Sequence, residues 1–329
     1  MSSLIFPFQK QPDMGGSESK EHPSGSPLLP EPWRTLEWSK RDEMKDHLRK
    51  LDISNEDVKH LRILVHGPVG AGKSSFINSL DSIFQGRMTN GATAEACAGH
   101  SCTRTYKTNK IKDGEYGSYL PFVINDAMGQ ERGDSEGVLT DDLIKILEGH
   151  IKEGYKFNSA KSCQQEEKGY NKDPNLNDKI HCLVTVIPAS SVLWCADSKS
   201  VLNNVMREKD EAFIKKIKDV RAQASTMDIP QVVILSKVDE ACREVNKDIT
   251  MIYRSRVIRE KIKYCSGNTG VPLNYIFPVK NYHEEIDLNK DMDVLLLSAL
   301  KHILTFANDH VAEMKERKSL KSTFKKLTS

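Results

Sequence analysis

The sequence has few of the features that mark a secreted, membrane-spanning or polyanion-binding protein. No apolar run approaches the ~20 residues that a helix needs to cross a bilayer, and no basic region precedes the short apolar patch at the N-terminus, so we expect neither a transmembrane segment nor a secretory signal. The seven cysteines are odd in number and unpatterned, which favours reduced thiols in the cytoplasm over a disulfide framework. A formal charge of +2 gives no reason to expect a nucleic-acid partner.

From residue 61 onward, short apolar runs alternate with longer amphipathic segments. The runs are nearly continuous in Val, Ile and Leu, as in strands buried on both faces of a parallel sheet, and they lie at 61–66, 119–126, 180–188, 231–236 and 274–279. The segments between them are expected helices, at 72–85, 137–153, 198–226, 248–265 and 291–316. This alternation predicts an α/β fold with a doubly wound, mostly parallel sheet and helices on both faces. The more polar stretch 103–111 is expected to add an edge strand.

The first apolar run leads into a glycine-rich phosphate-binding motif. The sequence Gly67-Pro68-Val69-Gly70-Ala71-Gly72-Lys73-Ser74 has the pattern G-x-x-x-x-G-K-S between a strand and a helix. The glycines let successive backbone N–H groups face a phosphate, and the helix N-terminus adds partial positive charge. The expected phosphate-binding residues are Gly67, Gly70, Ala71, Gly72, Lys73, Ser74 and Ser75. The expected fold is therefore that of a P-loop NTPase of the small-GTPase type, with the Ser74 hydroxyl on Mg²⁺.

The run 119–126 ends in Asp126-Ala127-Met128-Gly129-Gln130. An aspartate at the carboxyl end of a strand beside the P-loop predicts a carboxylate for the Mg²⁺ site. Gly129 is expected to offer its N–H to a γ-phosphate. Gln130 has the position of the water-orienting glutamine of small GTPases, and the alternative is an exposed loop residue.

The small and polar residues 90–108 have the composition of a switch loop, which needs a threonine to complete the Mg²⁺ shell. Thr103 is the candidate because it directly precedes the expected edge strand; Thr93 and Thr105 compete with it. Cys97, His100 and Cys102 lie close together in the same segment, but a structural zinc site needs a fourth ligand, so we interpret them as loop residues.

The run 231–236 continues into Ser236-Lys237-Val238-Asp239, where GTPases carry [N/T]-K-x-D. The Asp239 carboxylate can accept hydrogen bonds from the guanine ring nitrogen and amino group, and the Lys237 stem can lie along the base. Adenine lacks that amino group, so the motif favours GTP or GDP over ATP. Ser236 replaces the asparagine or threonine whose side chain normally braces the loop, which predicts a lower nucleotide affinity. Lys280 and Asn281 follow the last apolar run, where a loop lining the base is expected.

Four regions follow from these assignments. They are a disordered leader (1–32), a linker with a short helix that packs on the core (33–56), a GTPase-like P-loop domain (57–310) and a basic C-terminal tail (311–329). The short helix is expected over 39–51 with Ser39 at its N-cap. The domain contains a polar insertion at 154–178.

These stretches carry a resemblance to the interferon-induced protein 44 and 44-like family. The similarity runs from about residue 30 to 310 and rests on LRILVHGPVGAGKSSFINSLDSIFQG, YLPFVINDAMGQ, IHCLVTVIPASS, SKVD and DVLLLSALKHIL. The resemblance implies a GTPase-like fold, a cytoplasmic location, interferon-linked expression and a role in antiviral innate immunity. Longer relatives carry an N-terminal TLDc domain, where this sequence has about 30 residues before the core. Relatives vary at the base motif, so the resemblance does not by itself imply GTP turnover.

Two functions share the same residues. One is a slow Mg²⁺-dependent GTPase in which Gln130 and Thr103 are the catalytic residues and Ser74, Thr103 and Asp126 organise the metal. The other is a nucleotide-stabilised interaction module or scaffold without significant hydrolysis. An ATPase is a third reading, which the SKVD motif disfavours. A homodimer or a protein partner is compatible with the sequence, which does not specify one.

Overall fold

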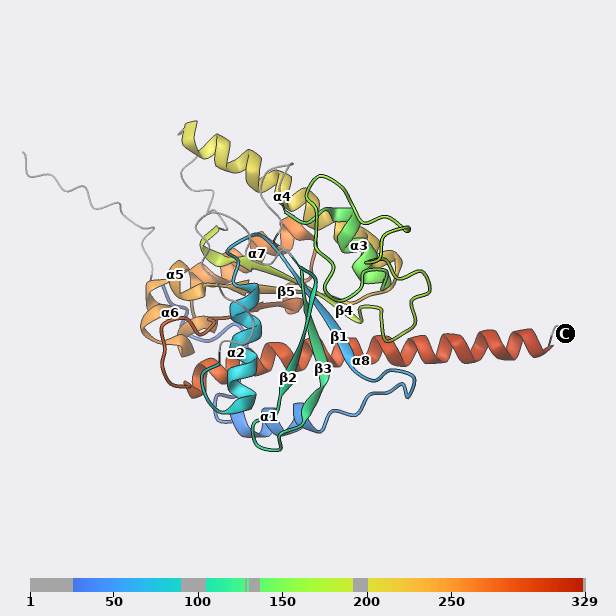
Figure 1. Ribbon diagram of the computed structural model, residues 1–329. Coiled ribbons are helices and arrows are strands. Elements are labelled where there is room, and N and C mark those ends of the chain that lie inside the picture. The colour runs from blue at the N-terminus through green and yellow to red at the C-terminus, as the bar shows by residue number, and fades with distance from the viewer. Residues whose placement is uncertain (1–25, 90–104, 128, 130–136, 192–200, 328–329) are drawn as a thin grey trace, which may run out of the picture.

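The computed structural model describes residues 26–89, 105–127, 129, 137–191 and 201–327, and the side chains among them except those of 201–212 and 321–327. A six-stranded sheet in the order β2-β3-β1-β4-β5-β6 lies at its centre (Figure 1). The strands are β1 (Leu61–His66), β2 (Lys107–Lys112), β3 (Tyr119–Asp126), β4 (Cys182–Pro188), β5 (Gln231–Ser236) and β6 (Ile276–Pro278). Only β2 pairs antiparallel among these strands, at the edge of the sheet. The expected α/β fold of the P-loop type, with a polar edge strand, is confirmed.

The central strands are apolar throughout because both of their faces are covered. In β1, Ile63 and Val65 belong to one hydrophobic cluster, whereas Leu64 belongs to a second cluster on the opposite face of the sheet. In β4, Leu183 and its neighbour Val184 divide between the two clusters in the same way. Successive side chains of a strand point to opposite faces, so each strand supplies both clusters.

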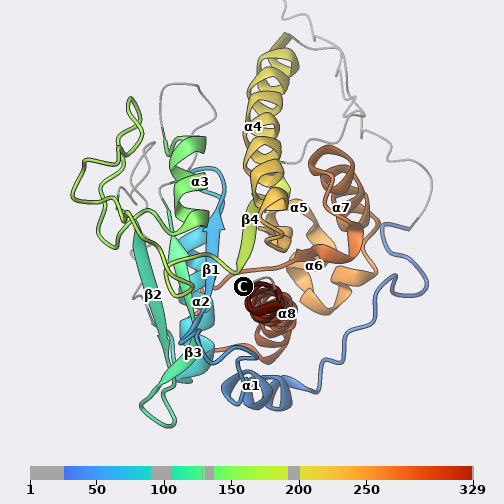
Figure 2. The same cartoon turned by 90° about the vertical axis from the view of Figure 1, so that its right-hand side faces the viewer.

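The described helices form two layers around the sheet. They are α1 (Arg41–Arg49), α2 (Lys73–Gln85), α3 (Thr140–Glu148), α4 (Val201–Thr226), α5 (Val238–Ala241), α6 (Arg243–Lys247), α7 (Arg256–Thr269) and α8 (Lys290–Leu327), with 3₁₀ turns at 189–191, 249–253 and 273–275. Helices α2 and α8 cover one face, and α1 packs against α8. Helices α3 and α4 pack together over the other face, with α7 beside α4 (Figure 2).

Three helices, besides the long C-terminal helix α8, differ clearly from their sequence-based expectation. Helix α1 begins at Arg41 after Lys40, which makes no side-chain capping bond, so the predicted cap at Ser39 is wrong. Helix α3 ends at Gly149, whose φ of 85° stops the helix before residue 153. The expected helix 248–265 is divided because the Ser255 hydroxyl accepts a hydrogen bond from the Ile258 N–H and caps a new helix, α7.

Helix α8 spans 38 residues and extends past the sheet. It therefore includes residues 311–327, assigned to a basic tail from sequence. Lys318 lies 2.8 Å from Asp57, and Lys315 and Arg317 form ion pairs with Glu56 and Asp228. Although α8 is long, none of the helices in the described ranges is apolar enough over a sufficient length to cross a membrane.

The insertion 154–178 connects α3 to β4 without a helix or strand in the structure. It nevertheless contributes buried side chains, among them Cys163 and Tyr170, to the cluster beneath α3 and α4. Isolated bridges join Thr105 to Lys156 and Ile151 to Tyr170. The insertion thus packs against the body at several points, including Thr105 and the side chains of Cys163 and Tyr170.

Candidate functional site

The expected site residues follow the carboxyl ends of four parallel strands. Strand β1 lies between β3 and β4, so the order of the strands reverses at β1. Open α/β sheets bind ligands at the carboxyl ends of the strands beside such a reversal. The P-loop follows β1, Asp126 ends β3, Ser236 ends β5, and the residues from Val279 onward follow β6. The topology therefore gathers the sequence-predicted residues at one edge.

The P-loop glycines adopt conformations that other residues avoid. Gly67, Gly70 and Gly72 have φ values of 149°, 76° and 90°, in the region that favours glycine. A Cβ on Gly67 would lie 2.2 Å from the Val186 carbonyl oxygen of β4. The first glycine is thus required by close backbone packing, and the third begins α2 as its N-cap.

Lys73 lies over the loop that precedes it. Its side chain is buried, and Nζ donates to the carbonyl oxygens of Gly67 at 3.2 Å and Pro68 at 3.0 Å. Gly129 packs against the P-loop and the Lys73 side chain, because a Cβ on Gly129 would lie 2.6 Å from Val69 Cγ2 and 3.1 Å from Lys73 Nζ. The lysine and the glycine expected at a γ-phosphate are therefore adjacent.

Ser74 and Asp126, the two described residues expected at the metal, lie side by side. The Ser74 hydroxyl donates to Asp126 Oδ2 at 3.2 Å. Asp126 is 3% exposed, and its Oδ1 has no hydrogen-bond partner among the described residues. Burial raises the pKa of Asp126, against the opposing effect of the Lys73 charge. A buried carboxylate with an unsatisfied oxygen beside a hydroxyl fits Mg²⁺, which prefers oxygen ligands.

Two side chains, one at the end of β5 and one after β6, donate hydrogen bonds to the P-loop. Ser236 is fully buried, and its hydroxyl donates to the Ala71 carbonyl at 2.6 Å. The serine therefore braces the P-loop where an asparagine or threonine usually does, and the lower nucleotide affinity expected from this replacement stays a prediction. Asn281 donates from Nδ2 to the Gly72 carbonyl at 3.1 Å.

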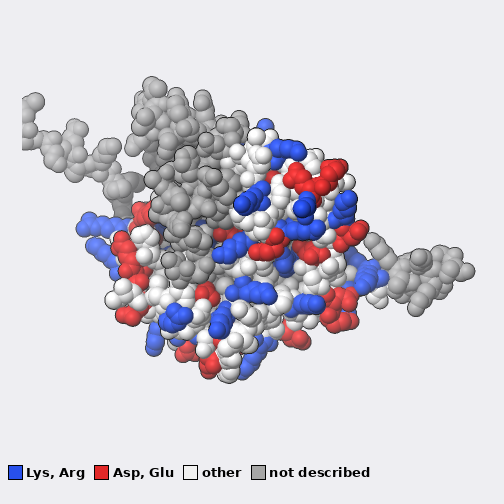
Figure 3. Space-filling view, in the orientation of Figure 1, with Lys and Arg blue, Asp and Glu red and all other residues white. Residues whose placement is uncertain are grey.

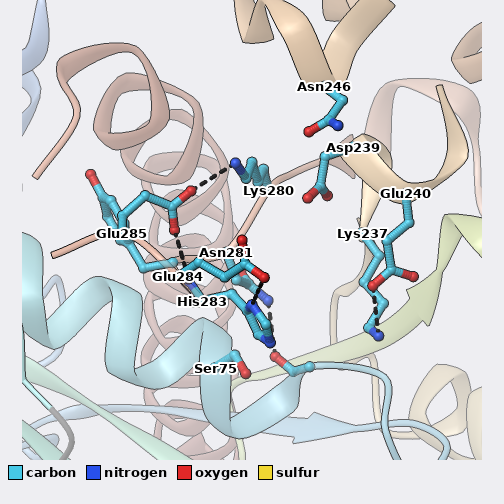
Figure 4. A pocket seen from close by; sticks show the side chains of 12 residues that line it. Ser75, Lys237, Asp239, Glu240, Asn246, Lys280, Asn281, His283, Glu284 and Glu285 are labelled. Carbon is cyan, nitrogen blue, oxygen red and sulfur yellow. Dashed lines mark hydrogen bonds and ion pairs between the residues drawn. The ribbon is translucent and has the colours of Figure 1, made fainter. Parts of the chain in front are cut away.

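A pocket of about 300 Å³ opens beside these contacts (Figure 4). Lys237, Asp239, Lys280 and Asn281 all line it, together with Gly72 and Ser75. The structure therefore brings the base-site candidates together next to the start of α2.

Neighbouring carboxylates engage both lysines of the pocket. Lys237 lies 3.0 Å from Glu240, and Lys280 lies 2.7 Å from Glu285. Asp239 is half-buried and makes no hydrogen bond or ion pair from its carboxylate to any residue in the described ranges. Its side chain extends into the space between the two lysines (Figure 4).

Tyr282, which continues the loop expected to line the base, also lines the pocket. The sequence patterns did not mark the further lining residues Glu240, Asn246, His283, Glu284 and Glu285. Although burial opposes the shift, hydrogen bonds from Lys280 and the His283 N–H lower the pKa of Glu285 to about 2. Residues 282–285 directly follow Lys280 and Asn281, so their position after the last strand was the available signal. Asn246 comes from α6, which no motif marked.

Gln130, Thr103, Thr93, Cys97, His100 and Cys102 lie outside the described residues. The competing Thr105 is described and bridges to Lys156 of the insertion. Among the described residues there is no group of three or more His, Cys, Asp or Glu that could hold a metal ion. Figure 3 shows lysines and arginines interspersed with acidic residues over the face in view.

A P-loop follows β1, Ser74 lies beside Asp126, and a pocket lined by residues of the S-K-x-D motif opens at the same edge of the sheet. These features define a GTPase-like P-loop protein. No family model matches the chain. It is 33% identical over 277 residues to interferon-induced protein 44 of Homo sapiens, covering 83% of this chain and 58% of that protein. To interferon-induced protein 44-like of Homo sapiens it is 32% identical over 257 residues, 78% of this chain and 54% of that protein.

The chain belongs, over this aligned part, to the interferon-induced protein 44 and 44-like family. It spans between half and two thirds of the length of these relatives. Among solved structures, Toc33 from Arabidopsis thaliana in complex with Mg²⁺ and GMPPNP is 14% identical over 82% of this chain and 92% of its own, with a TM-score of 0.39. A probable GTP-binding protein engB is 13% identical over 75% and 98%, also with a TM-score of 0.39.

Proposed function

We propose that this chain binds GTP and GDP together with Mg²⁺. The observation that carries the proposal is Asp239, a half-buried carboxylate without a partner in the described chain, at the wall of a pocket beside the P-loop. The pocket leaves the carboxylate oxygens open to a ligand, and an ionised carboxylate can only accept hydrogen bonds, so it favours a ligand that presents donors. Guanine offers two adjacent donors on one edge, and adenine does not.

The phosphates occupy the loop from Gly67 to Ser75, where backbone N–H groups and the start of α2 face them. Lys73 and Gly129 receive the γ-phosphate. Ser74 and Asp126 would hold Mg²⁺, which would supply positive charge beside the phosphates. A cation there would also favour the ionised form of the buried Asp126 carboxylate.

We further propose that the protein hydrolyses GTP, and we expect this hydrolysis to be slow. Gln130 orients the attacking water, and Thr103 completes the metal shell. If Gln130→Ala abolishes turnover in a protein that still binds GTP, the chain is a GTPase. If the wild type binds GTP tightly and releases no phosphate, it is a nucleotide-stabilised interaction module, which the same pocket also supports.

The test is equilibrium binding of GDP, a non-hydrolysable GTP analogue and ADP to the purified chain in Mg²⁺. Wild type is compared with Lys73→Ala and with Lys59→Ala, which changes an exposed lysine outside the pocket. We expect guanine nucleotides to bind wild type and Lys59→Ala, and Lys73→Ala to lose affinity. Equal affinity for ADP and GDP would instead support an ATPase, and no binding would refute the proposal.

The names of the relatives, interferon-induced protein 44 and 44-like, support a proposal about the cellular setting. We propose that expression of this chain rises on interferon treatment and that it acts in the cytoplasm in the antiviral response. Transcript measurement before and after interferon, with imaging of the tagged protein and virus yield in depleted cells, tests the three statements separately.

A further inference from the structure

The insertion 154–178 contacts the start of β2, which follows residues 90–104, and both ends of α3, which follows Gly129 in the chain (Figure 2). Its first anchor is the edge of the sheet. The Tyr106 N–H donates to the Tyr155 carbonyl at 2.8 Å, and the Gly154 N–H donates to the Tyr106 carbonyl at 3.0 Å. Thr105 and Tyr106 come directly before β2 and directly after residues 90–104. The insertion therefore fixes the point at which that segment enters the sheet.

The second anchor is the first turn of α3. Asp142 is fully buried, and its Oδ1 accepts from the Cys163 N–H at 2.8 Å and lies 2.7 Å from the Ser162 hydroxyl. Lys145 donates to the Ser162 hydroxyl and to the Cys163 carbonyl, both at 2.7 Å. A buried carboxylate with these donors holds the helix firmly to the insertion, because leaving it unpaired is costly.

The third anchor is the last turn of α3. The Asn171 N–H donates to the His150 carbonyl at 2.7 Å, and Asn171 Nδ2 donates to the Gly149 carbonyl at 3.1 Å. The Tyr170 ring stacks on His150 with centroids 4.9 Å apart. The insertion thus holds α3 at both ends.

The start of α3 is connected to the phosphate site. The Val138 N–H, two residues before Thr140, donates to the Gly129 carbonyl at 3.3 Å. Gly129 in turn packs against Val69 and Lys73 of the P-loop. A continuous set of contacts therefore runs from Ser162 through α3 to the residue expected at a γ-phosphate.

We propose that the insertion 154–178 is a clamp on α3 and on the start of β2 that sets how strongly the protein prefers GTP over GDP. This inference rests on the proposed nucleotide site. GDP ends at the β-phosphate, which the P-loop holds, so only GTP reaches Gly129. Loosening the clamp gives Gly129 more conformational freedom, and GTP must then restrict that freedom on binding. The affinity for GTP falls, and that for GDP does not.

The test measures the dissociation constants of GDP and a non-hydrolysable GTP analogue in Mg²⁺ for wild type, Ser162→Ala and Asp142→Asn. Gln165→Ala, an exposed change in the same insertion, is the control. We expect the GTP-to-GDP affinity ratio to fall about 5- to 10-fold in Ser162→Ala, and the control to match wild type. Hydrogen exchange of the α3 amides should become faster in the same variant.

Ser162 is half-buried, so Ser162→Ala keeps the test valid if Asp142→Asn fails to fold. An unchanged ratio in Ser162→Ala, or an equal loss of affinity for both nucleotides, would overturn the clamp and leave the nucleotide site standing. If wild type binds neither nucleotide, the proposed function fails and the clamp fails with it.

Discussion

The hydroxyl of Ser236 donates a 2.6 Å hydrogen bond to the carbonyl of Ala71. This bond joins the end of β5, from which the base-site residues follow, to the P-loop at the end of β1. A buried side chain therefore connects the residues expected at the base to the loop expected at the phosphates. A serine suffices here, because its hydroxyl lies within hydrogen-bond reach of the Ala71 carbonyl.

Ser236→Ala should weaken both folding and nucleotide binding. The variant leaves the Ala71 carbonyl without this donor, at a cost of about 1–3 kcal/mol in unfolding free energy. Urea unfolding and GDP titration measure the two effects. Ser236→Thr keeps the hydroxyl and serves as the control; a Ser236→Ala protein as stable and as tight as wild type would show that the brace is dispensable.

Ser74→Ala should remove the dependence of nucleotide binding on Mg²⁺. In wild type, chelation with EDTA should lower GTP affinity, since Ser74 and Asp126 would no longer share a cation. In Ser74→Ala the affinity should already be low and should change little on chelation. Lys59→Ala, which changes an exposed lysine outside the pocket, is the control. Equal sensitivity of Ser74→Ala and wild type to EDTA would exclude Ser74 as a ligand.

Sequence alone could predict the P-loop, because its conformation is determined locally by the glycines and by the strand and helix that flank them. Asp126 and Asp239 were also predictable, since each follows a buried apolar run. The pairing of Lys280 with Glu285 was not, because it depends on how a loop of a few residues folds back. The clamp of Ser162 on Asp142 joins residues 20 apart in sequence, and no local pattern reports such a contact.

Helix boundaries likewise separate into those that local sequence predicts and those that depend on distant contacts. The stop at Gly149 follows from a residue that readily adopts positive φ. The continuation of α8 beyond residue 316 depends in part on contacts of its basic side chains with Glu56 and Asp57, more than 250 residues earlier. A charged helix end gives no sequence signal of such partners.

Burial of His181 should make the protein less stable in mild acid. Burial lowers the pKa of His181 from 6.5 to about 4, and its Nδ1 accepts from the Arg62 N–H. Between those values the unfolded chain binds more protons, so stability present above pH 6.5 is lost as the pH falls towards 4. We expect a loss on the order of 2 kcal/mol between pH 7 and pH 5.

Urea unfolding at the two pH values measures this dependence in wild type, His181→Asn and the exposed-site control His47→Asn. His181→Asn retains an acceptor near Arg62 and should show a smaller difference between the two pH values. If His47→Asn alone reduced the difference, the titrating group would have been assigned wrongly.

Arg41→Ala should destabilise the fold and disturb the base pocket. Asp293 is fully buried and accepts from Arg41 Nε and from the Tyr282 hydroxyl, each at 2.6 Å. Removing the arginine leaves a buried charge without its partner, at a cost of about 3 kcal/mol. Tyr282 lines the pocket, so GDP affinity should fall as well. Adding Asp293→Asn to Arg41→Ala should restore part of the stability; no restoration would contradict the ion-pair explanation.

The most direct test of the nucleotide site is the base preference of Asp239→Asn. Xanthine carries a carbonyl oxygen where guanine carries its amino group, and an asparagine amide can donate to it where a carboxylate cannot. We predict that Asp239→Asn loses at least about 10-fold in affinity for GDP and gains affinity for xanthosine diphosphate, whereas Glu240→Gln keeps the wild-type preference. Unchanged affinity of Asp239→Asn for both nucleotides would contradict the assignment of this pocket to the base.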